Sequence, residues 1–171
     1  IDRNLPINLN DPVLLNVLSF GLFGASCVAI LILGLRVERT PRVAELAFLI
    51  VAAFLLFNKV WSPQYSLWLV PLAVLAFPQW KVLFPWMVTD AMVWPILMWH
   101  MLGTDNKGLP HEMLDLIVIS RDAFIVVMIV GVIRQMLGRR ADPVMDAHAG
   151  RDLLAGPFGA GERRKALKEV S

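Results

Sequence analysis

The 171-residue sequence contains a single cysteine and very little net charge. Cys27 lies inside an apolar run, so we expect neither a disulfide framework nor a cysteine-based metal site, and we predict no metal and no cofactor. The formal net charge of +2 is small and the basic residues form no stripe, which argues against a nucleic-acid partner. These absences exclude disulfide-stapled secreted domains, zinc modules and nucleic-acid-binding proteins.

Apolar residues, in contrast, are abundant and gather in long blocks. They make up 57% of the chain, which is the profile of a protein embedded in a lipid bilayer. A helix rises about 1.5 Å per residue and must cross a hydrocarbon core of roughly 30 Å. We therefore predict an all-α, polytopic transmembrane helical bundle of about five segments. The expected segments are residues 13–35, 43–60, 65–77, 82–102 and 113–137.

The second and third segments are short for complete spans. Residues 43–77 are expected to form either two spans completed by the polar turn between them or a broken, re-entrant helix pair. Either alternative leaves the direction of the later segments unchanged.

Both ends of the chain differ from its apolar middle. Residues 138–171 are rich in glycine and charge, and we expect a flexible, disordered cytoplasmic tail there. The first residues show neither an initiator methionine nor a signal-peptide pattern. We therefore expect the C-terminal piece of a longer polytopic protein.

The short basic segments predict the orientation. Residues 36–42, Lys81 and residues 139–140 fall on one side of the expected bundle, which the positive-inside rule assigns to the cytoplasm. The chain is then a multi-pass plasma-membrane protein that starts on the extracytoplasmic side and ends in the cytoplasm. The turn at residues 58–65 is expected to face the extracytoplasmic side.

Three charged residues interrupt the fourth and fifth apolar runs. Asp90, Arg121 and Asp122 would each cost about 2.5–3.5 kcal/mol at a helix centre facing lipid, so they should face protein or a water-filled cavity. Adjacent helical residues point about 100° apart, so Arg121 is expected to pair with Asp90 and not with Asp122. Two interpretations stay open: a structural salt bridge, or a cavity in which Arg121 binds a ligand phosphate.

The stretch NKVWSPQY, residues 58–65, is the most polar interruption of the apolar pattern. Its candidate binding residues are Asn58, Lys59, Ser62, Gln64 and Tyr65, which offer hydrogen-bonding groups and one positive charge. Ser62 followed by Pro63 fits a helix N-cap with proline at the first helical position. On chemistry alone, an ordinary extracytoplasmic turn explains the stretch equally well.

The longer stretch NKVWSPQYSLWLVPLAVLA resembles a segment of the polytopic GT-C glycosyltransferases, in particular family 87, the polyprenyl-phosphate-mannose-dependent mannosyltransferases and their relatives. The matching residues are Asn58, Lys59, Ser62, Pro63, Gln64, Tyr65, Leu69 and Pro71. The late Arg121–Asp122 pair and the charged tail are similar as well.

The resemblance implies transfer of mannose, or of another hexose or pentose, from a polyprenyl phosphate carrier to a glycan or glycolipid acceptor. Such enzymes use a carboxylate in their first extracytoplasmic loop as general base, and that loop would lie upstream of Ile1. We therefore expect no catalytic residue in this chain. The turn and Arg121 would bind the donor, and His100 would contact sugar or phosphate or be merely structural.

Two other functions remain open from the sequence. Broken helices and buried charges also occur in transporters and flippase-like subunits, where they form the translocation path. A structural membrane protein of envelope biogenesis would use Asp90 and Arg121 only to hold its helices together.

Overall fold

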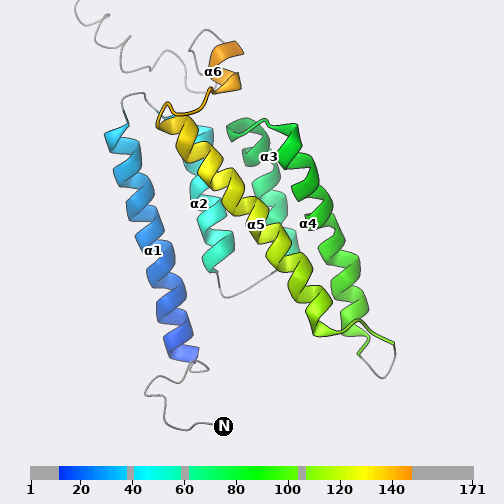
Figure 1. Ribbon diagram of the computed structural model, residues 1–171. Coiled ribbons are helices and arrows are strands. Elements are labelled where there is room, and N and C mark those ends of the chain that lie inside the picture. Colours follow the sequence, from blue (N-terminus) through cyan, green and yellow to red (C-terminus); the bar gives the residue numbers. More distant parts are fainter. Residues whose placement is uncertain (1–11, 38–40, 59–61, 104–106, 148–171) are drawn as a thin grey trace, which may run out of the picture.

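The computed structural model describes residues 12–37, 41–58, 62–103 and 107–147 (Figure 1). Its elements are α1 (Pro12–Arg36), α2 (Val43–Phe57), the 3-10 turn η1 (Pro63–Tyr65), α3 (Ser66–Ala76), α4 (Trp80–Met101), α5 (His111–Met136) and α6 (Pro143–Ala147). No strand occurs in these ranges, so the all-α prediction is confirmed for them. Three helices, α1, α4 and α5, are long and apolar enough to cross a membrane, which supports a membrane protein but not the expected count of five spans.

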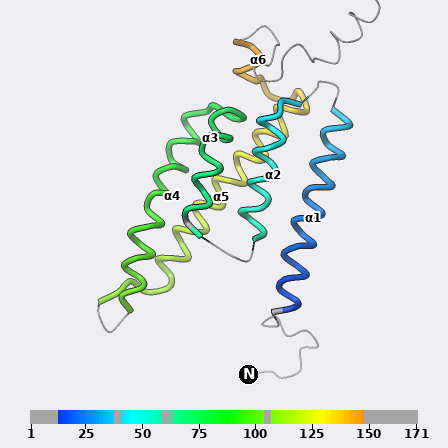
Figure 2. Tube along the Cα trace, turned by 180° about the vertical axis from the view of Figure 1, so that it is seen from behind, coloured from blue at the N-terminus to red at the C-terminus, as the bar shows by residue number. Residues whose placement is uncertain are grey.

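The two shorter helices form a hairpin. With 15 and 11 residues, α2 and α3 extend only about 22 and 17 Å along their axes. They pack against each other. The start of α2 lies beside the end of α3, where the Arg42 guanidinium donates to the Leu75 and Ala76 carbonyls at 2.7 and 3.1 Å. Both views show α1, α4 and α5 extending further than α2 and α3 on the side away from α6 (Figures 1 and 2). Helices α2 and α3 are shorter than the lengths expected of complete spans, so the re-entrant pair stays a prediction.

The apolar core lies between α2, α3, α4 and α5. Its fully buried members include Phe48, Leu69, Trp86 and Met128, one from each of these helices. None of the described side chains of α1 is buried, and α1 stands at the edge of the bundle beside α2. Its attachment includes the Phe23 ring, 5.9 Å from the Phe54 ring, and the Ser19 hydroxyl, which donates to the Phe57 carbonyl.

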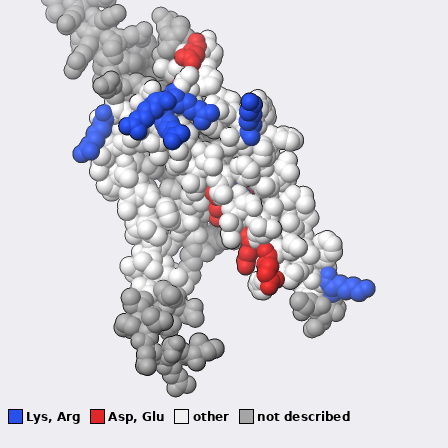
Figure 3. Space-filling view, viewed as in Figure 1, with Lys and Arg blue, Asp and Glu red and all other residues white. Residues whose placement is uncertain are grey.

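Charge is distributed unequally between the two ends of the bundle. Figure 3 shows Lys and Arg gathered where α1 and α5 end and α4 begins. The exposed members of this basic end are Arg36, Lys81, Arg134, Arg139 and Arg140. At the opposite end, the start of α5 carries the exposed carboxylates of Glu112 and Asp115. The hairpin of α2 and α3 begins and ends at the basic end.

A buried ion-pair cluster at the basic end was not predicted from the sequence. Arg42, 4% exposed, forms a bidentate pair with Asp142 at 3.1 and 3.2 Å. Its backbone N–H donates to the buried Glu45 carboxylate at 2.8 Å. Asp142 also accepts from the Val144 N–H at 3.1 Å, near the start of α6. Residues 138–147 are therefore held to the bundle and are not the start of a loose tail as expected; residues 148–171 lie outside the described ranges.

Arg42→Gln is expected to lower the free energy of unfolding by about 3–5 kcal/mol, because removing one partner of a buried pair leaves the other charge uncompensated. Thermal or denaturant unfolding of the intact protein in detergent measures the change. Arg139→Gln is the matched control, since Arg139 is exposed at the same end. Equal stabilities of the two variants would contradict the assignment of Arg42 as the link between the hairpin and Asp142.

Candidate functional site

The turn between α2 and α3 carries most of the predicted binding residues. Asn58, Ser62 and Tyr65 are half-buried, whereas Gln64 is exposed. Lys59 lies outside the described residues. Among the described residues of the turn, three side chains are thus half-buried and that of Gln64 is open to a ligand.

The start of α3 differs from the prediction of a Ser62 cap. Pro63 opens the 3-10 turn η1, and the Tyr65 N–H donates to the Ser62 carbonyl at 3.1 Å. The α-helix itself begins at Ser66, with Tyr65 at the cap position and no side-chain cap bond. Pro63 has the backbone angle that opens a helical turn, and the 3-10 turn that it opens precedes the α-helix.

Aromatic contacts hold the end of this turn. The Tyr65 ring lies 6.3 Å from the Phe54 ring of α2 and 5.1 Å from the Trp68 ring of α3. Offset or tilted aromatic pairs at these distances are worth about 0.5–1.5 kcal/mol each beyond their buried area. Tyr65 therefore links the last turn of α2 to the first turn of α3.

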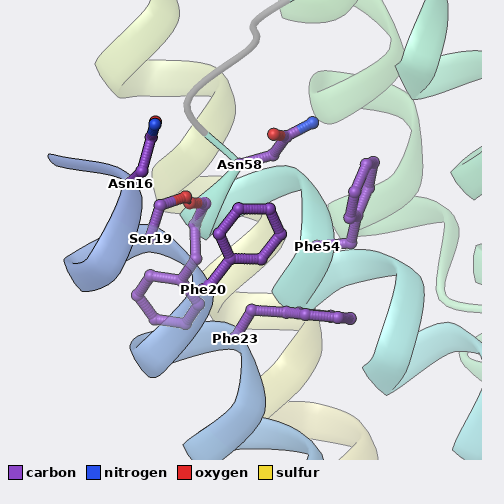
Figure 4. A pocket seen from close by; sticks show the side chains of 7 residues that line it. Asn16, Ser19, Phe20, Phe23, Phe54 and Asn58 are labelled. Carbon is purple, nitrogen blue, oxygen red and sulfur yellow. The ribbon is translucent and has the colours of Figure 1, made fainter. Parts of the chain in front are cut away.

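A pocket of about 220 Å³ lies between α1 and the end of α2 (Figure 4). Four phenylalanines and three polar residues line it: Asn16, Ser19, Phe20, Phe23, Phe54, Phe57 and Asn58. The Phe20 and Phe23 rings project from α1 into the space between the two helices, and Asn58 borders the same space. The pocket thus adjoins the polar turn. In the sequence, the spacing of Asn16, Ser19 and Phe23 places them on one face of a helix. This spacing was the available sequence signal for the pocket.

A second group of polar residues meets at the middle of the bundle. Arg121 Nε lies 3.1 Å from Asp90 Oδ1, which is the predicted pairing. Its Nη2 donates to the Ser66 hydroxyl at 2.7 Å. Arg121 is 1% exposed, and the three residues come from α5, α4 and α3. A single guanidinium therefore joins three helices.

Asp122 also reaches Arg121, contrary to the prediction. Arg121 Nη1 and Asp122 Oδ1 are 3.4 Å apart, although the two residues are neighbours on one helix. The arginine side chain is long enough to bring its guanidinium to the neighbouring carboxylate, so the divergence of the Cβ directions does not separate the charged ends. Asp90, Arg121 and Asp122 form one cluster, which we call the midplane triad.

The midplane triad lies next to the end of the turn, since Ser66, which accepts from Arg121, directly follows Tyr65 in the chain. His100 lies elsewhere, at the far end of α4. Its Nδ1 is 2.9 Å from the Leu109 carbonyl, and its ring is 4.4 Å from the His111 ring at the start of α5. These contacts belong to the α4–α5 connection, and the contact of His100 with sugar or phosphate stays a prediction.

Within the described ranges, no group of three or more His, Cys, Asp or Glu side chains could hold a metal ion. The candidate sites of the described residues are the polar turn, the aromatic pocket and the midplane triad. No protein-family model, no curated protein and no solved structure matches this sequence.

Proposed function

We propose that this chain is the C-terminal membrane part of a glycosyltransferase that takes a sugar from a polyprenyl phosphate carrier to a glycan or glycolipid of the cell envelope. One observation carries the proposal: the polar turn and the aromatic pocket meet at Asn58. A lipid-linked sugar has the same division, with a charged phosphate beside a long apolar chain. One ligand of this class would occupy both parts.

The turn suits the phosphate because several of its residues carry hydrogen-bonding side chains. Asn58 and Gln64 carry amide donors, and Tyr65 carries a phenol. Lys59 would supply the positive charge that a phosphate diester requires. Hydrogen bonds to a charged group are worth about 1.5–3 kcal/mol each, so two or three of them select a phosphate from neutral lipids.

Arg121 stabilises the end of the turn through Ser66 and does not contact the ligand. Asp90, Asp122 and Ser66 surround its guanidinium, and almost none of it is exposed. The bond to Ser66 fixes the point at which the turn ends and α3 begins. We therefore assign Arg121 a positioning role, in place of the direct phosphate contact expected from the sequence.

The aromatic pocket suits a segment of the prenyl chain. Its volume of about 220 Å³ is below the ~300–1,000 Å³ of pockets that enclose whole drug-sized ligands. Lipid tails are as apolar as the pocket, so transfer from bilayer to pocket brings little hydrophobic gain. The pocket contributes packing of the prenyl chain against four phenylalanine rings. This packing favours one conformation of the prenyl chain and places the phosphate at Asn58.

The charge distribution supports the orientation that this function needs. The basic end would face the cytoplasm by the positive-inside rule. The turn then opens toward the extracytoplasmic side, where the resemblance places the transfer of lipid-linked sugars. The catalytic carboxylate would come from a part of the protein outside this chain.

In the intact protein, Gln64→Ala and Lys59→Ala are each expected to lower sugar transfer about 10- to 100-fold, because each removes one hydrogen bond to a charged group. Transfer from a polyprenyl-phosphate sugar in membranes measures the loss, and membrane insertion should stay normal. Lys107→Ala, an exposed lysine at the α4–α5 connection, is the matched control. Normal transfer by both turn variants would remove the turn from the site.

A transporter or flippase is the second candidate, favoured by the midplane triad, because charged groups at this depth often mark transport pathways. It predicts that lipid flipping or solute uptake by the intact protein disappears in Arg121→Gln. The glycosyltransferase predicts loss of transfer without any such transport activity in the native protein.

A further inference from the structure

The midplane triad contains one positive and two negative side chains, and this imbalance lies at the middle of two candidate membrane spans. Asp90 is the eleventh of 22 residues in α4, and Asp122 is the twelfth of 26 in α5. With both carboxylates ionised, the triad would carry a net charge of −1 at the depth where charge is least tolerated. Asp122 Oδ1 is buried and has no hydrogen-bond partner among the described residues.

The remaining charged groups near α5 do not correct the imbalance. Of the helices packed against α5, α4 carries Lys81 and His100 only near its two ends. The only charged residue of α2 is Glu45, which lies at the basic end, and α3 has no charged residue. Arg121 is therefore the only described cation at the depth of the two carboxylates.

Asp90 is the better-matched partner of that cation. Its Oδ1 is 3.1 Å from Arg121 Nε and its side chain is 17% exposed, whereas Asp122 stands 3.4 Å from Nη1 and is 36% exposed. The surface around Asp122 is apolar, since Ile119 and Val126, one helical turn to either side, are 65% and 46% exposed. Such a surface suits acyl chains or a further apolar helix, and against either of them the exposed part of Asp122 gains no solvation from water.

We propose that Asp122 is a proton-binding site within the membrane, occupied at neutral pH. A carboxylate without a full partner in an apolar medium is neutralised by taking up a proton. The proton from water forms an O–H bond with the Asp122 carboxyl, and the triad becomes electrically neutral. The charged Asp90–Arg121 pair and the Arg121–Ser66 bond remain intact. Glu112 and Asp115, toward the start of α5, place further carboxylates between Asp122 and the end opposite the basic end.

The proton is favoured over a metal cation because the triad offers two carboxylates and already contains a guanidinium. No set of three or more acidic, histidine or cysteine ligands exists in the described part of the chain. Loss of the proton would force two carboxylates to share Arg121 and would weaken its hold on Ser66. Proton occupancy is thereby linked to the position of the first residue of α3.

Infrared difference spectroscopy of the intact protein in lipid nanodiscs tests the proposal. At neutral pH, the wild-type spectrum minus that of Asp122→Asn should contain the carbonyl stretch of a protonated carboxylic acid, and this band should shift in D₂O. The same subtraction with Asp115→Asn, an exposed carboxylate on the same helix, should lack the band. Asp122→Glu should move the band and Asp90→Glu should leave it in place, which assigns the proton and keeps the test available if Asp122→Asn does not fold.

A wild-type spectrum whose Asp122→Asn difference shows only ionised carboxylate would overturn the proposal. So would a band that moves in Asp90→Glu and not in Asp122→Glu. A band change on replacing potassium by sodium at constant pH would identify a sodium site and likewise overturn it. All three outcomes are independent of sugar transfer.

Discussion

Arg121→Leu is expected to lower the free energy of unfolding by about 3–5 kcal/mol, because it leaves two carboxylates uncompensated inside the bundle. The substitution leaves Asp90 and Asp122 without a cation at the middle of the bundle and removes the donor to Ser66. Unfolding of the intact protein in detergent or bicelles measures the change. Arg134→Leu is the control, because Arg134 lies on the same helix but is exposed at the basic end.

A charge exchange separates the structural role of Arg121 from ligand binding. Asp90→Arg and Arg121→Asp should each destabilise the protein, and the double variant should recover at least half of the lost stability, since contacting charges couple strongly in double-mutant cycles. Additive losses would contradict the assignment of Asp90 and Arg121 as a structural pair. Sugar transfer should recover less completely than stability, because Arg121→Asp also removes the donor to Ser66 that positions the end of the turn.

Ser19→Trp is expected to lower kcat/KM for the polyprenyl-phosphate donor about 10- to 100-fold, mostly through KM. The indole would fill the aromatic pocket, and displacing a ligand segment or overpacking such a space costs about 1–3 kcal/mol. Transfer measured against donor concentration gives both constants.

Leu22→Trp provides the control for this prediction. Leu22 is 49% exposed on α1 and does not line the pocket, so the same bulk is added to the same helix on a different face. An unchanged KM in Ser19→Trp, with normal insertion, would show that the donor does not use the pocket.

The sequence predicted the helical class and most helix positions because long apolar blocks leave few alternatives in a bilayer. It also predicted the pairing of Asp90 with Arg121, since two opposite charges in the middle of neighbouring apolar runs are each costly when unpaired. The contact of Arg121 with Asp122 was missed, because side-chain direction at Cβ does not limit the reach of a guanidinium.

Two larger features were not predictable from local patterns. Arg42 was counted among the basic residues that set orientation, but its partner Asp142 lies 100 residues away, in a segment whose composition suggests a tail. The aromatic pocket requires two helices to be placed side by side, and phenylalanines that line a pocket have the same sequence pattern as those that face lipid. The donor-binding assignment of the turn remains a prediction, and Lys59 lies outside the described residues.

The most direct measurement is photo-crosslinking of the intact protein in nanodiscs with a polyprenyl phosphate that carries a photoreactive group in its first isoprene units. We expect crosslinks at Phe20 or Phe57, suppressed by excess unlabelled polyprenyl phosphate but not by the neutral polyprenol, and reduced in Gln64→Ala. Crosslinks that spread evenly over the lipid-facing helices, or that the neutral polyprenol suppresses equally well, would contradict a donor site formed by the polar turn and the aromatic pocket.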